Sequence, residues 1–187
     1  MAEIILASAS PRRKQLLQWA EMEFEIVVHP TDESYPPGLS LQQTAIHIAM
    51  QKAEAVKHLG VNKIIIAADT IVVLDKEIIG KPKDRADAIS ILTKLSGRQH
   101  QVITGVVIMR NEKVISFADV TAVDFHNLTH EQIIFYIDKY KPYDKAGAYA
   151  IQEWIGVIGI KKISGDFYNV MGLPVSRVVR ELKMLMR

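Results

Sequence analysis

The sequence of 187 residues contains no cysteine, and this absence excludes several kinds of chemistry. Without thiols there is no disulfide framework, no thiolate metal site and no cysteine nucleophile, which fits a reducing compartment. The N-terminus also lacks the apolar core of a secretory signal, because Arg12, Arg13 and Lys14 come too early. No hydrophobic run approaches the length of a membrane span. We therefore expect a cytoplasmic protein with no membrane partner.

The sequence also has no large excess of charge of one sign. Lysine and arginine together number 23 and aspartate and glutamate 21, which gives a formal net charge of +2. This balance argues against nucleic acid as a partner, so any anion site must be local. The Walker A sequence, the G-x-G-x-x-G loop and the H-E-x-x-H helix are all missing. If the protein is a nucleotide enzyme, it must therefore bind phosphates through a motif other than these three.

What is present is typical of one globular domain. The hydrophobic fraction is 49% and the charged fraction 24%, and no repeat, linker or low-complexity tract interrupts the chain. We therefore expect a single domain over residues 1–187 with alternating strands and helices. Expected strands cover 4–7, 24–28, 63–74, 99–109, 113–125 and 157–163, and expected helices start at Pro11, Leu41, Arg85, His130 and Val175.

The most informative stretch is 6–14, in which an apolar strand passes through small polar residues, Ser8 among them, into three cations. Ser10 is a good helix N-cap and Pro11 suits the first helical turn, so a helix should begin there. Its free N–H groups and the positive end of its dipole favour a bound anion. Arg12 and Arg13 add paired donors for phosphate oxygens. The stretch predicts a polyphosphate site, with a solvated basic turn as the alternative.

Two lysines are further candidates for binding phosphate. Lys52 falls within the apolar stripe of the helix expected over 41–59, so its ammonium should point inward and needs an anionic partner. That partner would be a structural carboxylate or a ligand phosphate, and the alternative is that the side chain reaches out to solvent. Lys81 lies between Gly80 and Pro82 in a turn that restricts its backbone.

Four further residues carry polar groups suited to catalysis or recognition. Asp69 and Thr70 interrupt an apolar strand, which suits a site at a strand break; an aspartate that caps a turn is the alternative. Glu33 lies in a proline-rich loop and is a candidate oxygen ligand for Mg²⁺, although solvated loop acids are common. Gln152 follows a loop of small residues, and its amide can read the edge of a nucleobase.

Taken together, these stretches resemble the Maf family of nucleoside triphosphate pyrophosphatases, and the likeness extends over nearly the whole chain in the family's order. Two positions depart from the family pattern: Asp166, and Glu153-Trp154 after Gln152. The matching blocks are 6–13, 67–70, 80–82, Ser96-Gly97 with Thr104-Gly105, 144–149 through Gln152, and 169–174.

The resemblance implies a mixed twisted sheet flanked by helices, like that of the inosine triphosphate pyrophosphatases, with two lobes and a central cleft. It also implies hydrolysis of a nucleoside triphosphate to the monophosphate and pyrophosphate with a divalent cation, Mg²⁺ or Mn²⁺. Asp69 would be the proton acceptor, and Arg12, Thr70 and Gln152 would mark the subgroup acting on dTTP and UTP, with modified pyrimidine triphosphates as further substrates. In agreement with the resemblance, the chemistry of the residues leads us to expect that Ser8, Arg12, Arg13, Lys52 and Lys81 bind phosphate and that Glu33 and Asp69 bind the metal.

Three other functions are weighed against this one. The related subgroup that acts on 7-methyl-GTP is similar overall. A nucleotide-binding regulator of cell division, which does not turn its ligand over, would gain nothing from a carboxylate such as Asp69 beside phosphates. A nucleic-acid-binding protein is disfavoured by the near-neutral charge balance. Apolar strand edges could support a homodimer.

Overall fold

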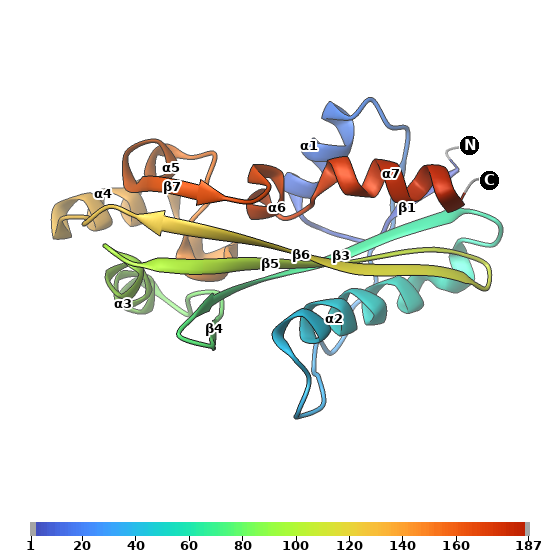
Figure 1. The fold of residues 1–187 in the computed structure, drawn as a ribbon, viewed down its shortest axis with the longest axis horizontal. Coiled ribbons are helices and arrows are strands. Elements are labelled where there is room, and N and C mark those ends of the chain that lie inside the picture. Colours follow the sequence, from blue (N-terminus) through green and yellow to red (C-terminus); the bar gives the residue numbers. More distant parts are fainter. Residues whose placement is uncertain (1–2, 186–187) are drawn as a thin grey trace. The chain divides into compact units, whose positions relative to one another are not determined.

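The computed structural model of the protein describes residues 3–185. Its strands form one sheet in the order β2-β1-β3-β5-β6-β7, and β4 pairs with β3 (Figure 1). Pairing is parallel on both sides of β1, but antiparallel between β3 and β4 and between β6 and β7. The predicted mixed sheet with flanking helices is therefore confirmed.

The elements follow one another in the order that the hydrophobic pattern indicates. The strands are β1 (Ile4–Leu6), β2 (Glu25–Ile26), β3 (Ile64–Leu74), β4 (Glu77–Ile79), β5 (Gln99–Arg110), β6 (Lys113–Phe125) and β7 (Ile160–Ser164). The α-helices are α1 (Pro11–Trp19), α2 (Leu41–Val56), α3 (Arg85–Leu95), α4 (His130–Tyr140), α5 (Trp154–Gly159), α6 (Phe167–Met171) and α7 (Val175–Leu185). Short 3₁₀ helices cover Lys57–Leu59 (η1), Pro142–Asp144 (η2) and Ala146–Ala148 (η3).

The chain divides into two compact units. The first unit holds residues 1–70, 104–119 and 172–187, and the second holds 71–103 and 120–171. Strands β3, β5 and β6 each contribute residues to both units. Within residues 3–185, no helix is long and apolar enough to cross a membrane. The single domain over 1–187 stays a prediction.

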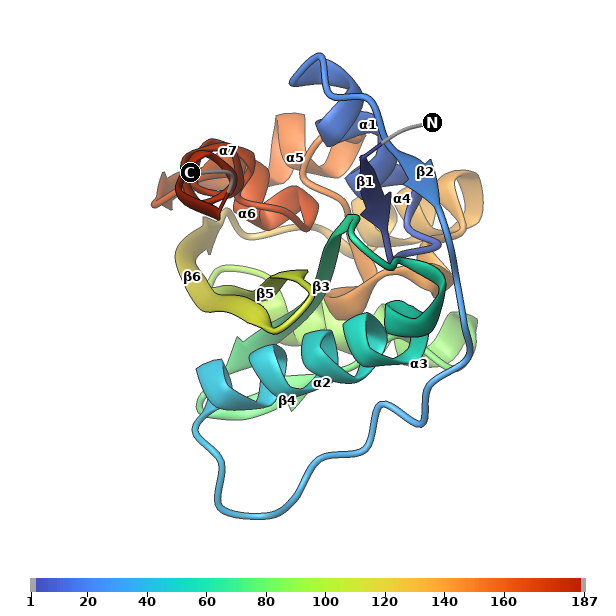
Figure 2. The ribbon, with the colours of Figure 1, turned by 90° about the vertical axis from the view of Figure 1, so that its right-hand side faces the viewer.

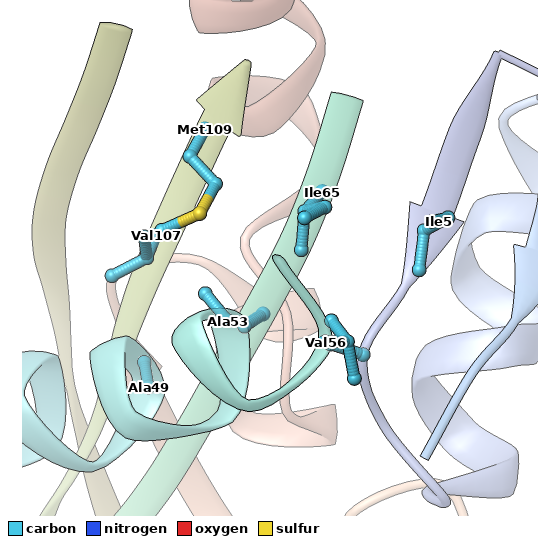
Figure 3. Close-up of a cluster of buried hydrophobic side chains, with 9 residues drawn as sticks. Ile5, Ala49, Ala53, Val56, Ile65, Val107 and Met109 are labelled. Atoms are coloured by element: carbon cyan, nitrogen blue, oxygen red, sulfur yellow. The ribbon is translucent and has the colours of Figure 1, made fainter. Parts of the chain in front are cut away.

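In the first unit, α2 packs its small apolar face on the sheet (Figure 3). Ala49, Ala53 and Val56 recur at helical spacing and contact side chains of the central strands. Small residues let the helix approach the sheet closely, and burial of this surface is the main stabilising contribution. The rest of this cluster is Ile5, Ala7, Ile65, Ala67, Val107 and Met109.

The register of β3 determines where its polar residues point. Alternate side chains of a strand lie on opposite faces, and Ile65 and Ala67 pack in the cluster under α2. Asp69 continues this series and faces α2, whereas Thr70 faces the other side, where α1 and α7 lie (Figures 1 and 2). One strand therefore presents a carboxylate to one layer of helices and a hydroxyl to the other.

Several expected boundaries were wrong, and each has a local cause. No strand break occurs at Asp69: β3 is continuous, because both polar side chains find partners without leaving the hydrogen-bond ladder. The strand expected over 24–28 is formed only at Glu25–Ile26. The strand expected from Val157 begins at Ile160, because α5 occupies the preceding residues. The short elements β4 and α6 were not predicted.

Gly105 of β5 lies against the backbone of α2 and should tolerate no side chain. A Cβ added there would come within 2.3 Å of the carbonyl carbon of Ala45 and the nitrogen of Ile46. Because backbone rather than a flexible side chain is in the way, we expect Gly105→Ala to lower the free energy of unfolding by about 2–3 kcal/mol. Urea denaturation measures the loss. Gly80→Ala, whose added Cβ meets nothing within 4 Å, is the control and should be near neutral.

In the second unit, a buried histidine is part of an aromatic cluster. The Nε2 of His100 forms a hydrogen bond of 2.8 Å with the Oη of Tyr149, and both rings contact Phe125 edge-on. Burial lowers the pKa of His100 to about 4, although Asp124 opposes the shift, and burial raises the pKa of Tyr149. Both side chains are therefore uncharged near neutral pH.

This histidine should make the stability of the protein depend on pH. Unfolded, His100 binds a proton below about pH 6.5, but folded only below about 4, so the unfolded state binds more protons between these values. Stability is complete above about pH 6.5, and as the pH falls to 4 this group alone should remove about 3 kcal/mol. Urea denaturation at several pH values measures the slope. His100→Gln, which cannot titrate, should show a shallower slope, and an unchanged slope would contradict the prediction.

Candidate active site

Lys52 and Asp69 form the centre of the candidate site in the first unit. The Nζ of Lys52 donates to Oδ1 of Asp69 at 2.6 Å and lies 2.8 Å from Oε1 of Glu33. The side chains of Lys52 and Asp69 are only 17% and 14% exposed, so the two charges need each other. The sequence predicted an inward lysine with an anionic partner, and the structure provides two carboxylates. Oδ2 of Asp69 has no partner among residues 3–185 and is available to a water molecule.

The loop that carries Glu33 is held against α2. Figure 2 shows it as the long blue connection from β2 to the start of α2. The Nε2 of Gln51 donates to the carbonyl of Ser34 at 2.8 Å, next to the ion pair between Lys52 and Glu33. Glu33 has a φ of 50°, in the left-handed region that residues other than glycine rarely adopt. These contacts place a strained loop residue beside Asp69.

The pair of carboxylates fits a small divalent cation. Both contact one atom, the Nζ of Lys52, so the two carboxylates lie close to each other. Within the described range 3–185, no three or more His, Asp or Glu side chains lie close enough together to bind a metal ion by themselves. Mg²⁺ is commonly held by one or two carboxylates with phosphate and water completing its shell, which is the arrangement this pair allows.

Arg13 lies on the other side of β3, and it is buried. Its Nε donates to the carbonyl of Gly172 at 2.8 Å, Nη1 to the hydroxyl of Ser8 at 3.1 Å and Nη2 to the hydroxyl of Thr70 at 3.0 Å. All three acceptors are neutral. Burial lowers the pKa of Arg13, and the carboxylate of Asp69 opposes that shift most strongly. The guanidinium therefore joins three separate segments and keeps two N–H groups for other acceptors.

Ser8 is oriented by donors on two sides. Its Oγ accepts from the backbone N–H of Ser10 at 3.2 Å and from Arg13, so the hydroxyl proton is left to donate. Ser10 caps α1 as predicted, and Pro11 occupies the first turn. Arg12, also on this turn, is half-buried. The first turn of α1 therefore carries hydroxyl, backbone and guanidinium donors within a few residues.

Two residues that contact Thr70 and Arg13 were not predicted to belong to the site. The hydroxyl of Thr104 lies 3.0 Å from that of Thr70, and the carbonyl of Gly172 accepts from Arg13. Both lie in blocks that match the family pattern, and Gly172 has a φ of 118°, which favours glycine. The glycine before Leu173-Pro174 is a signal of a positive φ, but nothing in the sequence indicates that its carbonyl accepts a hydrogen bond from Arg13.

Lys81 and Gln152 belong to the second unit, where both side chains are exposed. The loops that carry them meet there, since the N–H of Gly147 donates to the carbonyl of Gly80 at 3.1 Å. Of the predicted site residues, the first unit holds Ser8, Arg12, Arg13, Glu33, Lys52, Asp69 and Thr70.

Comparison with known proteins identifies the family. Residues 3–185 match the family model described as Maf-like protein. The chain belongs to the Maf family. It is 51% identical to the dTTP/UTP pyrophosphatase of Cytophaga hutchinsonii, over 97% of this chain and 83% of that protein. It is 49% identical to the protein of the same name from Parabacteroides distasonis, over 97% and 95% of the two chains.

The fold of this Maf protein also occurs in a more distant protein of known structure. The structure of a HAM1 protein from Coxiella burnetii matches with a TM-score of 0.51 and 18% sequence identity, covering 97% of this chain and 100% of that one. At this identity, the likeness concerns the fold alone. It agrees with the mixed sheet and flanking helices that the resemblance to the Maf family implied.

Proposed function

We propose that this Maf protein hydrolyses dTTP and UTP to the nucleoside monophosphate and pyrophosphate. The observation that carries the proposal is identity of about half of all residues, over nearly the full chain, with relatives named dTTP/UTP pyrophosphatase. The carboxylate of Asp69, with one oxygen on Lys52 and the other available to water, gives this reaction a suitable base.

In the proposed reaction a water molecule attacks the α-phosphorus. Oδ2 of Asp69 accepts a proton from that water, while Oδ1 stays bonded to Lys52, which fixes the carboxylate in place. A bond forms between the water oxygen and the α-phosphorus, and the bond from this phosphorus to the bridging oxygen breaks. Pyrophosphate leaves with the electron pair.

We assign the divalent cation, Mg²⁺ or Mn²⁺, to Glu33 and Asp69. Carboxylate oxygens are the ligands that such hard cations prefer. When bound, the cation would neutralise charge on the phosphates and lower the pKa of a bound water. Glu33 is 48% exposed and so can reach both solvent and Lys52.

The remaining predicted residues are proposed to bind the substrate. A triphosphate carries charge over several oxygens and calls for cations from separate segments. We assign this task to Arg12, Lys52 and Lys81 together with the spare donors of Ser8 and Arg13. Recognition of the pyrimidine is assigned to Arg12, Thr70 and Gln152; because the hydroxyl of Thr70 is bonded to Arg13, Thr70 acts in part by holding that guanidinium.

The test is product analysis in water labelled with ¹⁸O. The protein is incubated with Mg²⁺ and with dTTP, UTP, modified pyrimidine triphosphates, CTP, ATP or 7-methyl-GTP in turn. We expect pyrophosphate from dTTP and UTP, with the label in dTMP and UMP. Label in the pyrophosphate would mean attack at the β-phosphorus, and release of orthophosphate alone would contradict the cleavage position. Turnover of 7-methyl-GTP alone would assign the chain to the other subgroup.

A further inference from the structure

The turn that carries Gln152 combines a free side chain with a tightly held backbone. Gln152 is exposed, and its amide takes part in no hydrogen bond with any residue of the described range. The two residues before it, Ala150 and Ile151, are buried, and the N–H of Glu153, the residue after it, donates to the carbonyl of Ala150 at 3.1 Å. The turn is therefore fixed while its outward side chain stays available to a ligand.

One buried hydroxyl holds both ends of this turn. Tyr136 of α4 is completely buried, and its Oη accepts from the backbone N–H of Ala150 at 3.1 Å. The same hydroxyl donates to Oε2 of Glu153 in a short hydrogen bond. Tyr136 thus bonds to the residues two before and one after Gln152. Such a network is strong because little water competes with it.

The second oxygen of Glu153 is also engaged. Oε1 lies 3.7 Å from the Nζ of Lys145, a side chain only 10% exposed that also pairs with Asp144 at 2.8 Å. Glu153 therefore contacts Tyr136 through one oxygen and Lys145 through the other. Glu153 stands at one of the two positions where the sequence departs from the Maf pattern, so the network includes one of these departures.

Helix α5, which follows the turn, packs directly against it. A Cβ added to Gly156 of α5 would lie 1.7 Å from the carbonyl oxygen of Ile151, so glycine lets this helix contact the turn directly. The backbone on both sides of Gln152 is therefore constrained by α4 and by α5. Nothing in this arrangement constrains the amide itself.

We propose that Tyr136, Glu153 and Lys145 are positioning residues that hold Gln152 ready to bind the pyrimidine base; this inference rests on the proposed function. A uracil or thymine edge offers an acceptor and a donor side by side, which one carboxamide can match. A fixed backbone lowers the entropy that binding must overcome. The base lies far from the reacting phosphorus in the substrate itself, so these contacts should affect KM and not kcat.

The test compares single and double variants with dTTP. Tyr136→Phe removes the hydroxyl and keeps the ring; we expect it to raise KM about tenfold, because binding must then order a loosened backbone turn, with kcat within about twofold of the starting protein. Tyr140→Phe is the matched control, because Tyr140 lies on the same helix, stacks on Tyr136 and bonds to no described residue through its hydroxyl. KM of this control should not change.

A double-mutant cycle separates positioning from a general structural effect. If Tyr136 acts through Gln152, Tyr136→Phe should have no further effect on KM, or on the Kd of a non-hydrolysable dTTP analogue, in a Gln152→Ala background. The full tenfold effect in that background, or no effect in the single variant, would overturn the inference. Failure of the unmodified protein to release pyrophosphate from dTTP would instead refute the proposed function.

Discussion

Replacing Asp69 by asparagine should lower kcat for dTTP about a thousandfold, within the range expected for loss of a positioned general base. Asparagine keeps the shape of the side chain and can still accept from Lys52, but it cannot take a proton from water. The fold should survive, because Lys52 keeps Glu33 at 2.8 Å as a countercharge. Pyrophosphate release measures kcat, and thermal unfolding should show a change of only a few degrees.

The control for this variant is Asp75→Asn. Asp75 is 67% exposed, forms a surface ion pair with Arg98 and has a φ of 51°, which asparagine tolerates well. We expect kcat of the control to match that of the unmodified protein. If Asp69→Asn also kept near-normal turnover, Asp69 would not be the base. Glu33, the other carboxylate on Lys52, would then be the candidate for that role.

Asp69 also shows what the sequence could predict. An acid within an apolar strand, and a lysine within an apolar helical stripe, each signalled a buried charge that needed a partner. The two signals are complementary, and the structure pairs Lys52 with Asp69. Helical periodicity gave the face on which Lys52 lies. The apolar run around Asp69 does not alternate, so the face of Asp69 followed only from the packing of α2 on β3.

Other contacts left no periodic signal. Glu33 lies in a loop, where no repeating pattern fixes the direction of a side chain, and its left-handed backbone depends on contacts with α2. Similarly, Val157 and Ile158 have high β propensity and predict a strand, but they lie in α5, where Gly156 packs on the carbonyl of Ile151. Local preference was outweighed by packing between segments.

Packing also decides the role of Arg13, which the sequence analysis grouped with Arg12 as a phosphate ligand. Consecutive residues of a helix point about 100° apart, so only one of two neighbouring arginines can be directed into the core. The structure buries Arg13 and leaves Arg12 half-buried. A cation pattern alone could not tell which of the two would hold the scaffold together.

Because of this difference, Arg13→Lys should be far more damaging than an arginine-to-lysine change on the surface. A lysine ammonium is a single point and cannot reach Ser8, Thr70 and Gly172 at once as the planar guanidinium does. We expect the free energy of unfolding to fall by about 3 kcal/mol, because buried acceptors lose their charged donor. Urea denaturation measures this loss, and KM for dTTP should rise as Ser8 loses its orientation.

The comparison is Arg98→Lys, which alters an arginine 46% exposed in an ion pair with Asp75. Surface pairs contribute at most about 1 kcal/mol, and lysine can replace arginine in one, so this control should be nearly neutral. Equal stability of the two variants would mean that the carbonyl of Gly172 and the hydroxyls of Ser8 and Thr70 do not need the guanidinium. Arg13 would then return to the role that the sequence first suggested, as a ligand for phosphate alone.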